Sequence, residues 1–174
     1  MDASKALIEE LFAGCDKLSI LELVKIQARV LLPLIRAFRS EFGSDRTDRI
    51  VREALRQWAK ELYRRIGTQL EGFPVEKFDA AVSATVPKIG ADVDFETLQQ
   101  TPEQWNFNIR GCRYADFFRQ LGEPELGALL LCDMDVHMTE QLGGGDVKLE
   151  RTQTIMKGAE YCDFRWSMKR SAGS

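Results

Sequence analysis

The stretch Asp92–Gly111, DVDFETLQQTPEQWNFNIRG, decides the fold class. Apolar and polar residues alternate on both sides of Thr101-Pro102, which is typical of two half-buried strands joined by a turn. The apolar members of the pattern are Val93, Phe95, Leu98, Trp105, Phe107 and Ile109. Because helical spacing occupies much of the chain on either side, the sequence predicts an α+β fold.

Two long helices are predicted before these strands, over residues 18–42 and 44–70. In both segments the apolar residues recur at three- and four-residue spacing, as they do along one face of an amphipathic helix. We expect the first helix to be largely buried and kinked near Pro33, because proline removes a helical hydrogen bond. The second is expected to bury Trp58 on its apolar face.

Shorter helices complete the predicted helical content. They are expected at residues 2–12, from Val75 to about Ala84, from Cys112 to Leu121, and from Glu123-Pro124 to about Leu142. Glycines follow the last two helices, and glycine is the residue that most often ends a helix. Two helices are therefore inserted between the strand pair and the end of the chain.

A closing β-hairpin is predicted from Val147–Met156 and Tyr161–Met168, with apolar residues alternating along both strands. We therefore expect a single α+β domain over residues 1–174. Its N-terminal helices pack on an antiparallel sheet that has two inserted helices and ends in this C-terminal β-hairpin. The helical part is 1–72, and the sheet-containing part, 92–170, carries the candidate site.

The composition is that of an ordinary globular protein. Of the 174 residues, 44% are hydrophobic and 29% are charged, so disorder and a disulfide scaffold are excluded. The 24 Lys and Arg residues against 27 Asp and Glu give a net charge of -3, so we expect no nucleic acid partner. No apolar stretch approaches the roughly 20 residues of a membrane span, so we expect no membrane partner.

The four cysteines are isolated, at positions 15, 112, 132 and 162. They form no Cys-x-x-Cys pair and no secretory segment precedes them, so reduced thiols in the cytoplasm are expected. A zinc site built from Cys112, Cys132, Cys162 and Asp135 is an alternative, but structural zinc sites usually take their ligands in close pairs, and we expect no metal. No phosphate-binding loop, dinucleotide fingerprint or serine hydrolase motif occurs, and we expect no cofactor.

Cys112 is the first candidate for chemistry. It follows a predicted strand and begins a predicted helix, which places its sulfur near unpaired backbone N–H groups. That position lowers the pKa of a thiol, and Arg110 and Arg113 would lower it further if they point the same way. A thiolate formed near neutral pH is a nucleophile, whereas the alternative is a small buried apolar residue.

A second group of candidates lies in the last predicted helix and the hairpin. Cys132 and Asp135 are three residues apart, so they share a helix face. Alternation places Arg151 on the apolar face of the hairpin, where a guanidinium needs a partner. That partner is either Asp135 or the carboxylate of a bound ligand. Cys162 shares a face with Phe164 and is expected in the core.

Several short motifs in the C-terminal half resemble one known family. They are Cys112-Arg113-Tyr114-Ala115, Leu121-Gly122, Glu125-Leu126-Gly127, Cys132 with Asp135, the run from Arg151 to Met156, and Cys162-Asp163-Phe164-Arg165. In this order and at this spacing they are similar to the L-2-amino-thiazoline-4-carboxylic acid hydrolase family. The helical half, from Gln27 onward, is similar more loosely, so the resemblance covers most of the chain.

The resemblance implies a cofactor-free hydrolase that opens a small cyclic amidine such as 2-amino-thiazoline-4-carboxylate toward a carbamoyl-cysteine. On this hypothesis Cys112, or a water that it activates, attacks the ring carbon between nitrogen and sulfur, and Asp135 protonates the ring nitrogen or leaving group. Arg151 is expected to hold the substrate carboxylate. Cys132 is a further catalytic candidate, and the further substrate-binding candidates are Arg110, Tyr114 and Cys162.

Two other functions are open at this point. The hairpin is distantly similar to that of vinyl-reductase-type ligand-binding domains, so the same pocket would suit a non-catalytic binding or sensing module. A metal-dependent enzyme would instead use the cysteines as ligands. Association of the chain into a homo-oligomer is open as well.

Overall fold

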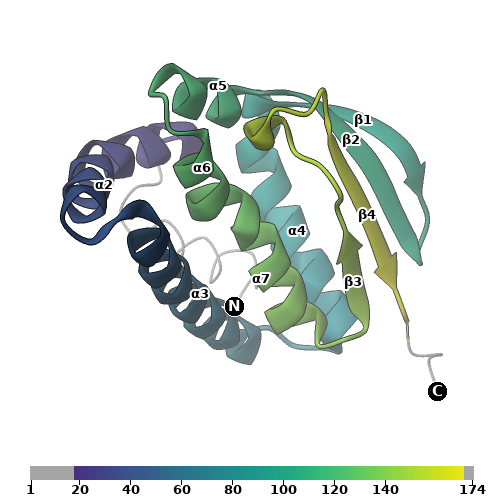
Figure 1. Cartoon of the computed structure of the whole chain (residues 1–174). Helices are drawn as coiled ribbons and strands as arrows, with labels where there is room; N and C mark the ends of the chain where they lie inside the picture. Colours follow the sequence, from purple (N-terminus) through teal and green to yellow (C-terminus); the bar gives the residue numbers. More distant parts are fainter. Residues whose placement is uncertain (1–17, 171–174) are drawn as a thin grey trace.

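One antiparallel sheet and a set of helices on one of its faces make up residues 18–170, the part of the chain that the computed structural model describes (Figure 1). The strands are β1 (Val93–Gln100), β2 (Gln104–Cys112), β3 (Val147–Glu150) and β4 (Cys162–Met168), in the order β1-β2-β4-β3. The helices are α2 (Ile20–Phe42), α3 (Ser44–Gln69), α4 (Pro74–Ile89), α5 (Arg113–Gln120), α6 (Pro124–Gly127) and α7 (Asp133–Gly143). The predicted α+β class is confirmed, and the helix predicted at residues 2–12 lies outside the described residues.

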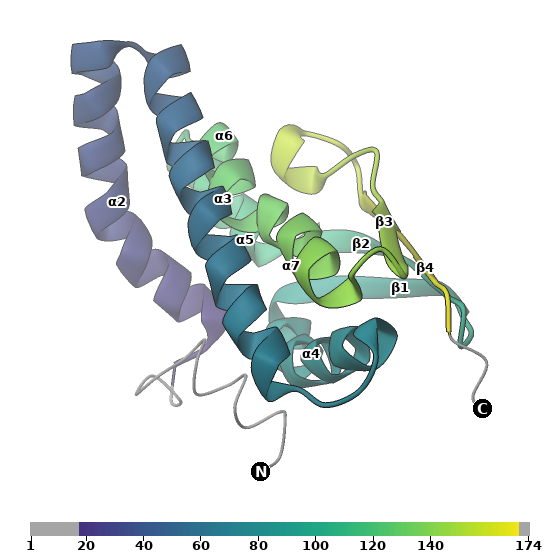
Figure 2. The ribbon, with the colours of Figure 1, turned by 90° about the horizontal axis from the view of Figure 1, so that it is seen from below.

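The helices form two layers on the sheet (Figures 1 and 2). Helices α4 and α7 lie between the sheet and α3, and α2 packs beside α3 in the outer layer, where it also contacts α4 and Glu123. The buried apolar residues form one cluster that reaches from α2 to the sheet. The N-terminal helical hairpin is therefore connected to the sheet mainly through α4 and α7.

Stacked aromatic side chains join the two central strands. Trp105 lies opposite Trp166 and Phe107 lies opposite Phe164 in the register of β2 and β4. The ring centroids are 5.3 Å apart in the first pair and 4.9 Å in the second, and both pairs are stacked. Such cross-strand aromatic pairs stabilise a sheet by about 0.2–1 kcal/mol each relative to alanine.

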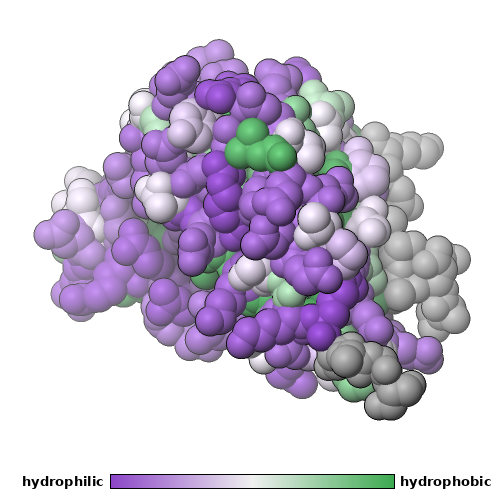
Figure 3. Space-filling view, turned by 90° about the vertical axis from the view of Figure 1, so that its right-hand side faces the viewer, coloured by the Kyte–Doolittle hydropathy of each residue, from purple (hydrophilic) through white to green (hydrophobic). Residues whose placement is uncertain are grey.

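The other face of the sheet is largely hydrophilic (Figure 3). On it the Arg110 Nε donates to Glu96 at 2.7 Å, and the Arg165 Nη2 donates to Asn108 at 2.9 Å. Because β-strand side chains alternate between faces, these polar residues lie opposite the aromatic core. The sheet therefore has one dry and one hydrated face.

The hairpin differs from the prediction because β3 ends at Glu150. Beyond it, the Asp163 carboxylate accepts hydrogen bonds from the backbone N–H groups of Thr152 and Gln153, at 3.0 and 2.8 Å. These bonds take the place of a strand ladder, and a 3-10 turn at Ile155–Lys157 follows. The alternation predicted as far as Met156 is therefore wrong, since Ile155 and Met156 are both buried.

Two predictions of burial are also wrong. Helix α2 runs on through Pro33 to its end, but it buries a single stripe and leaves many of its other apolar residues exposed. Trp58 is exposed, because it lies at the edge of the face that Ala59, Leu62 and Ile66 bury. Within the described residues, no helix combines the length and apolar character needed to cross a membrane.

Candidate functional site

A partly buried ion pair joins the loop after β3 to the start of α7. The Arg151 Nη1 donates to Asp135 Oδ2 at 2.7 Å, and its Nη2 donates to the carbonyl oxygen of Cys132 at 2.8 Å. The guanidinium also lies over the Phe164 ring, 5.0 Å from its centroid. The predicted inward direction of Arg151 is confirmed, and of the two predicted partners the structure shows Asp135.

Two features position the main chain at Asp135: a wider helical turn before it and a hydrogen bond from the following turn. A π-helical segment, Ala128–Cys132, separates α6 from α7, and such wider turns are frequent at functional sites. Beyond it, the Thr139 hydroxyl donates to the carbonyl oxygen of Asp135 at 2.7 Å. The same hydroxyl accepts from the Trp166 Nε1 at 3.0 Å. This chain of hydrogen bonds ties the first turn of α7 to the sheet.

Asp135 is surrounded by protein, but part of its side chain is accessible to solvent. Burial raises the pKa of its carboxyl group, and the nearby Arg151 opposes that shift only in part. At the same time 36% of its side-chain surface is accessible, against 9% for Arg151. A carboxyl group with a raised pKa and an accessible surface is suited to exchange a proton with a bound molecule.

Three free thiols gather around this ion pair. Cys112 comes from the end of β2, Cys132 from the π-helical segment and Cys162 from the start of β4. Each interacts electrostatically with the other groups: Cys132 with Asp135, Arg151 and both other thiols, and Cys162 with Cys112. The predicted convergence of these residues is therefore found, and we call the three cysteines with Asp135 and Arg151 the thiol–carboxylate cluster.

The pKa of Cys112 is raised, so its predicted depression is wrong. Burial raises the pKa of this thiol, and the N–H groups of Ala115 and Tyr114 at the start of α5 lower it only in part. The neighbouring arginines do not lower the pKa of Cys112, because each is paired with a carboxylate. Arg113 donates to Asp92 at 3.0 Å, whereas Arg110 pairs with Glu96 on the hydrophilic face of the sheet.

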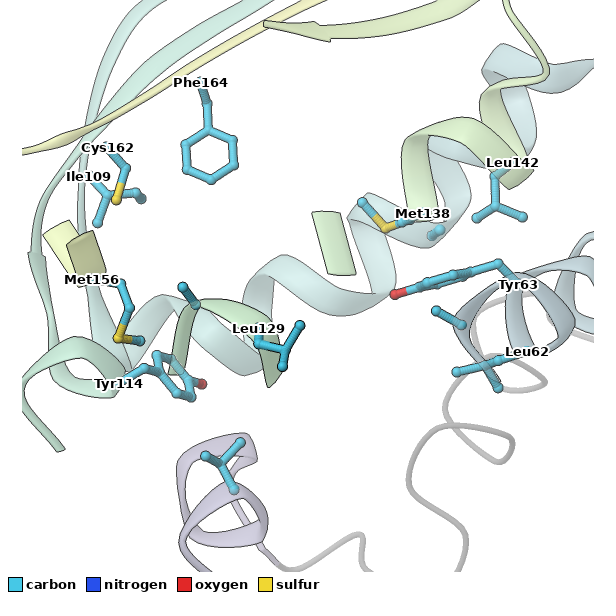
Figure 4. Packing of buried hydrophobic residues seen from close by; sticks show 14 of the residues in the cluster. Leu62, Tyr63, Ile109, Tyr114, Leu129, Met138, Leu142, Met156, Cys162 and Phe164 are labelled. Atoms are coloured by element: carbon cyan, nitrogen blue, oxygen red, sulfur yellow. The ribbon is translucent and has the colours of Figure 1, made fainter. Parts of the chain in front are cut away.

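The pKa values of the other two thiols are also raised, at the half-buried Cys132 and the buried Cys162. Burial raises the pKa of Cys132 to about 12. Cys162 is a core residue, as predicted, and its Sγ accepts a hydrogen bond from the Ile155 N–H at 3.2 Å. Figure 4 shows its sulfur beside Ile109 and on the same side of the sheet as the Phe164 ring. The thiolate of Cys112 is favoured by two backbone N–H groups and that of Cys162 by one, whereas no backbone N–H group lowers the pKa of Cys132.

Two tyrosines lie near the cluster, and only one was a predicted site residue. Tyr114 is buried, and its hydroxyl donates to Asp92 at 3.5 Å. Tyr63, on α3, is also buried, and Figure 4 shows its hydroxyl pointing from α3 into the packed interior. Burial and the negative charge of Asp135 raise the pKa of Tyr63. It was not among the candidates predicted from the sequence, although it follows Ala59 by one turn on the buried face of α3.

The structure places Arg110 away from the cluster, on the opposite face of the sheet. Tyr114 lies near Cys112, but its hydroxyl is engaged with Asp92. Within residues 18–170, no group of three or more His, Cys, Asp or Glu side chains is arranged to hold a metal ion. A hollow of about 590 Å³ between α4 and the ends of β1 and β2, lined by Phe78 and Trp105 among others, includes none of the cluster residues.

Comparison with known proteins gives one family. The family model described as L-2-amino-thiazoline-4-carboxylic acid hydrolase matches residues 24–166. The match includes every residue of the thiol–carboxylate cluster. A search of curated proteins finds no match.

Proposed function

Since this chain belongs to the L-2-amino-thiazoline-4-carboxylic acid hydrolase family, we propose that it hydrolyses a small cyclic amidine at the thiol–carboxylate cluster. One observation carries the proposal. Cys112, Cys132, Cys162, Asp135 and Arg151 come from five different segments and gather at one place inside the matched region. An accessible carboxyl group, a cation and thiols in one apolar setting are the groups that such a reaction needs.

The proposed reaction consumes one water. Its oxygen becomes the carbamoyl oxygen, the ring C–N bond breaks, and the ring nitrogen leaves with a proton from Asp135. The raised pKa of Asp135 supports this role, because a general acid works best when its pKa is near the working pH. For 2-amino-thiazoline-4-carboxylate the product is a carbamoyl-cysteine with a free amino group.

Cys112 is the proposed nucleophile, acting directly or through a water that it deprotonates. Its pKa is raised in the unliganded protein, so a thiolate needs further stabilisation. A cyclic amidine is a base, and its protonated form would bring a positive charge next to the sulfur. An adjacent cation favours the thiolate, so the substrate itself would help to activate Cys112.

The sequence predicted that Arg151 holds the substrate carboxylate, and the proposed role leaves fewer of its N–H groups for that contact. Both terminal nitrogens of its guanidinium already donate to protein acceptors, Asp135 and the Cys132 carbonyl. A two-point clamp on a substrate carboxylate would have to replace one of them. We propose that Arg151 orients Asp135 and binds the substrate carboxylate through its remaining N–H groups.

The proposal is tested by incubating the full chain with 2-amino-thiazoline-4-carboxylate and a panel of related cyclic amidines. Mass spectrometry would show the addition of one water, and a thiol reagent would separate the two ring-opening directions. Breaking the C–N bond leaves no free thiol on the product, whereas breaking the C–S bond releases one. Absence of turnover on the whole panel would contradict the proposal.

A non-catalytic ligand-binding module is the second candidate, and one observation favours it. Burial raises the pKa of all three thiols, which makes them poor nucleophiles without a ligand. This function predicts that a cyclic amidine raises the melting temperature in proportion to its occupancy and is recovered unchanged.

A further inference from the structure

Helix α2 has two apolar faces, and the folded chain covers one of them. Five residues face α3 and the core: Leu21, Val24, Ala28, Leu32 and Ile35. On the rest of the helix, Ile26, Val30, Leu34, Phe38 and Phe42 follow one another at four-residue spacing, with Leu31 beside them. These six residues, which we call the α2 outer stripe, are 36% to 63% exposed. Apolar residues around most of a helix are typical of a helix that is covered on both sides.

The described chain leaves this side of α2 open. Figures 1 and 2 show α2 at the margin of the molecule, with α3 on its inner side and no described helix or strand on the other. The outer stripe exposes on the order of 600 Å² of apolar surface, at the upper end of what a monomer shows in one patch. A standard interface buries about 800 Å² per partner, a little over half of it apolar. The stripe alone can therefore supply the apolar part of a stable interface.

We propose that the α2 outer stripe is a homodimer interface, in which α2 packs antiparallel on α2 of a second copy about a two-fold axis at Leu34. The spacing of the stripe is the reason for proposing a second copy of this chain as the partner. Symmetry about Leu34 places Val30 opposite Phe38 and Ile26 opposite Phe42 of the other copy. Leu34 meets its own copy at the axis, and on either side of it a smaller side chain meets a larger one, as interdigitating ridges require.

Two further features fit an antiparallel pair. The four-residue ridge is the one that packs most often between helices in globular proteins. Antiparallel helices also oppose their macrodipoles, which removes a repulsion that parallel packing would create. At the end of the stripe, Phe42 is held by its own chain, since its ring lies 6.3 Å from that of Phe38 and beneath Arg46. The large side chains of the interface are therefore ordered before association.

Sedimentation analysis of the full chain from about 1 to about 100 μM tests the proposal. The unchanged protein is expected to be a dimer at about 10 μM. Leu34→Glu places two carboxylates at the axis and is expected to raise the dissociation constant at least about 100-fold. Leu98→Glu is the matched control, because Leu98 is as exposed as Leu34 but lies on β1, and its dimer is expected to be unchanged.

Two additional variants keep the test decisive if a charged residue unfolds α2. Phe38→Ala keeps the helix and is expected to raise the dissociation constant about 10-fold. Leu34→Lys chains mixed with Leu34→Glu chains are expected to form heterodimers, since the two residues meet at the axis. The proposal is overturned if the wild-type protein is a monomer. This holds whether another partner or a segment of its own chain covers the stripe. A dimer that none of the stripe substitutions weakens would overturn it as well.

Discussion

Arg151 is bound to Asp135 across the boundary between the sheet and the helical layer, with 2.7 Å between Nη1 and Oδ2. The arginine follows β3, and the carboxylate lies in the first turn of α7. The pair therefore fixes the loop that carries the C-terminal motifs onto the helix that carries the candidate acid. Its integrity is a condition for both stability and the proposed chemistry.

Removing one partner of this pair is expected to lower the free energy of unfolding more than removing both partners. Arg151→Gln leaves the Asp135 carboxylate without its cation, and we expect it to lower the free energy of unfolding by about 2–4 kcal/mol. Asp135→Asn removes the charge that needs compensation, so the double variant is expected to be less destabilised than the sum, by at least about 1 kcal/mol. Urea unfolding of the four proteins measures this coupling. Arg110→Gln, which breaks an exposed pair and a contact with the Tyr161 ring on the other face of the sheet, serves as control. Strictly additive losses at positions 151 and 135 would contradict the account.

Stability should depend on pH in opposite directions at two carboxyl groups. The pKa of Asp135 is raised above its unfolded value of 3.8, so its contribution is complete below that value and is lost as the pH rises through the folded pKa. At Asp163 burial raises the pKa, but the hydrogen bonds from Thr152 and Gln153 together lower it by more than burial raises it. The pKa of Asp163 is therefore lowered. Its contribution is present above pH 3.8 and is lost as the pH falls. Unfolding curves of Asp135→Asn and Asp163→Asn against pH should therefore diverge from the unchanged protein at opposite ends, and parallel profiles would refute the assignment.

The three thiols of the cluster should react slowly in the folded protein. With iodoacetamide at pH 8 we expect their alkylation to be at least about 10-fold slower than in urea, because burial raises the pKa of all three. Of the three, Cys112 should be modified first, since two backbone N–H groups favour its thiolate, against one for Cys162 and none for Cys132. Peptide mass spectrometry gives the order. For turnover, Cys112→Ser is expected to abolish activity and Cys132→Ser to reduce it, and a fully active Cys112→Ser protein would remove Cys112 from the mechanism.

Tyr63 is expected to matter for the ligand and not for folding. No hydrogen-bond partner of its hydroxyl is found among the described residues, so Tyr63→Phe should leave the free energy of unfolding unchanged within about 0.5 kcal/mol. If the hydroxyl faces the bound substrate beside Asp135, the same substitution should lower kcat/KM about 10-fold. Tyr114→Phe, whose hydroxyl is engaged with Asp92, is the comparison. Equal effects of the two substitutions on kcat/KM would speak against a role for Tyr63.

Local patterns predicted the elements of the fold well where burial is one-sided. The alternation around Trp105 and Phe107 gave β1 and β2, and Gly122 and Gly143 marked the ends of helices. The pattern failed after Glu150, because the carboxylate of Asp163 replaces the backbone ladder there. A side chain that binds the main chain from a distant position leaves no trace in periodicity.

The candidate site was predictable in its members but not in its electrostatics. Strand spacing placed Arg151 inward and helix spacing put Asp135 on the same face as Cys132, and the structure pairs Arg151 with Asp135. The pKa of Cys112 had the wrong predicted sign, because a helix start is visible in the sequence whereas the depth of burial is a property of the whole fold. The position of Tyr63 near Asp135 was not predicted either, since α3 meets α7 only in the folded chain.

The crystal structure of the full chain bound to 2-amino-thiazoline-4-carboxylate, or to a hydrolysis-resistant cyclic amidine, tests the central claim most directly. The account predicts the ring within hydrogen-bonding distance of the Asp135 carboxyl group and beside the Cys112 sulfur. A ligand bound instead in the hollow between α4 and the ends of β1 and β2, with the thiol–carboxylate cluster unchanged, would contradict it.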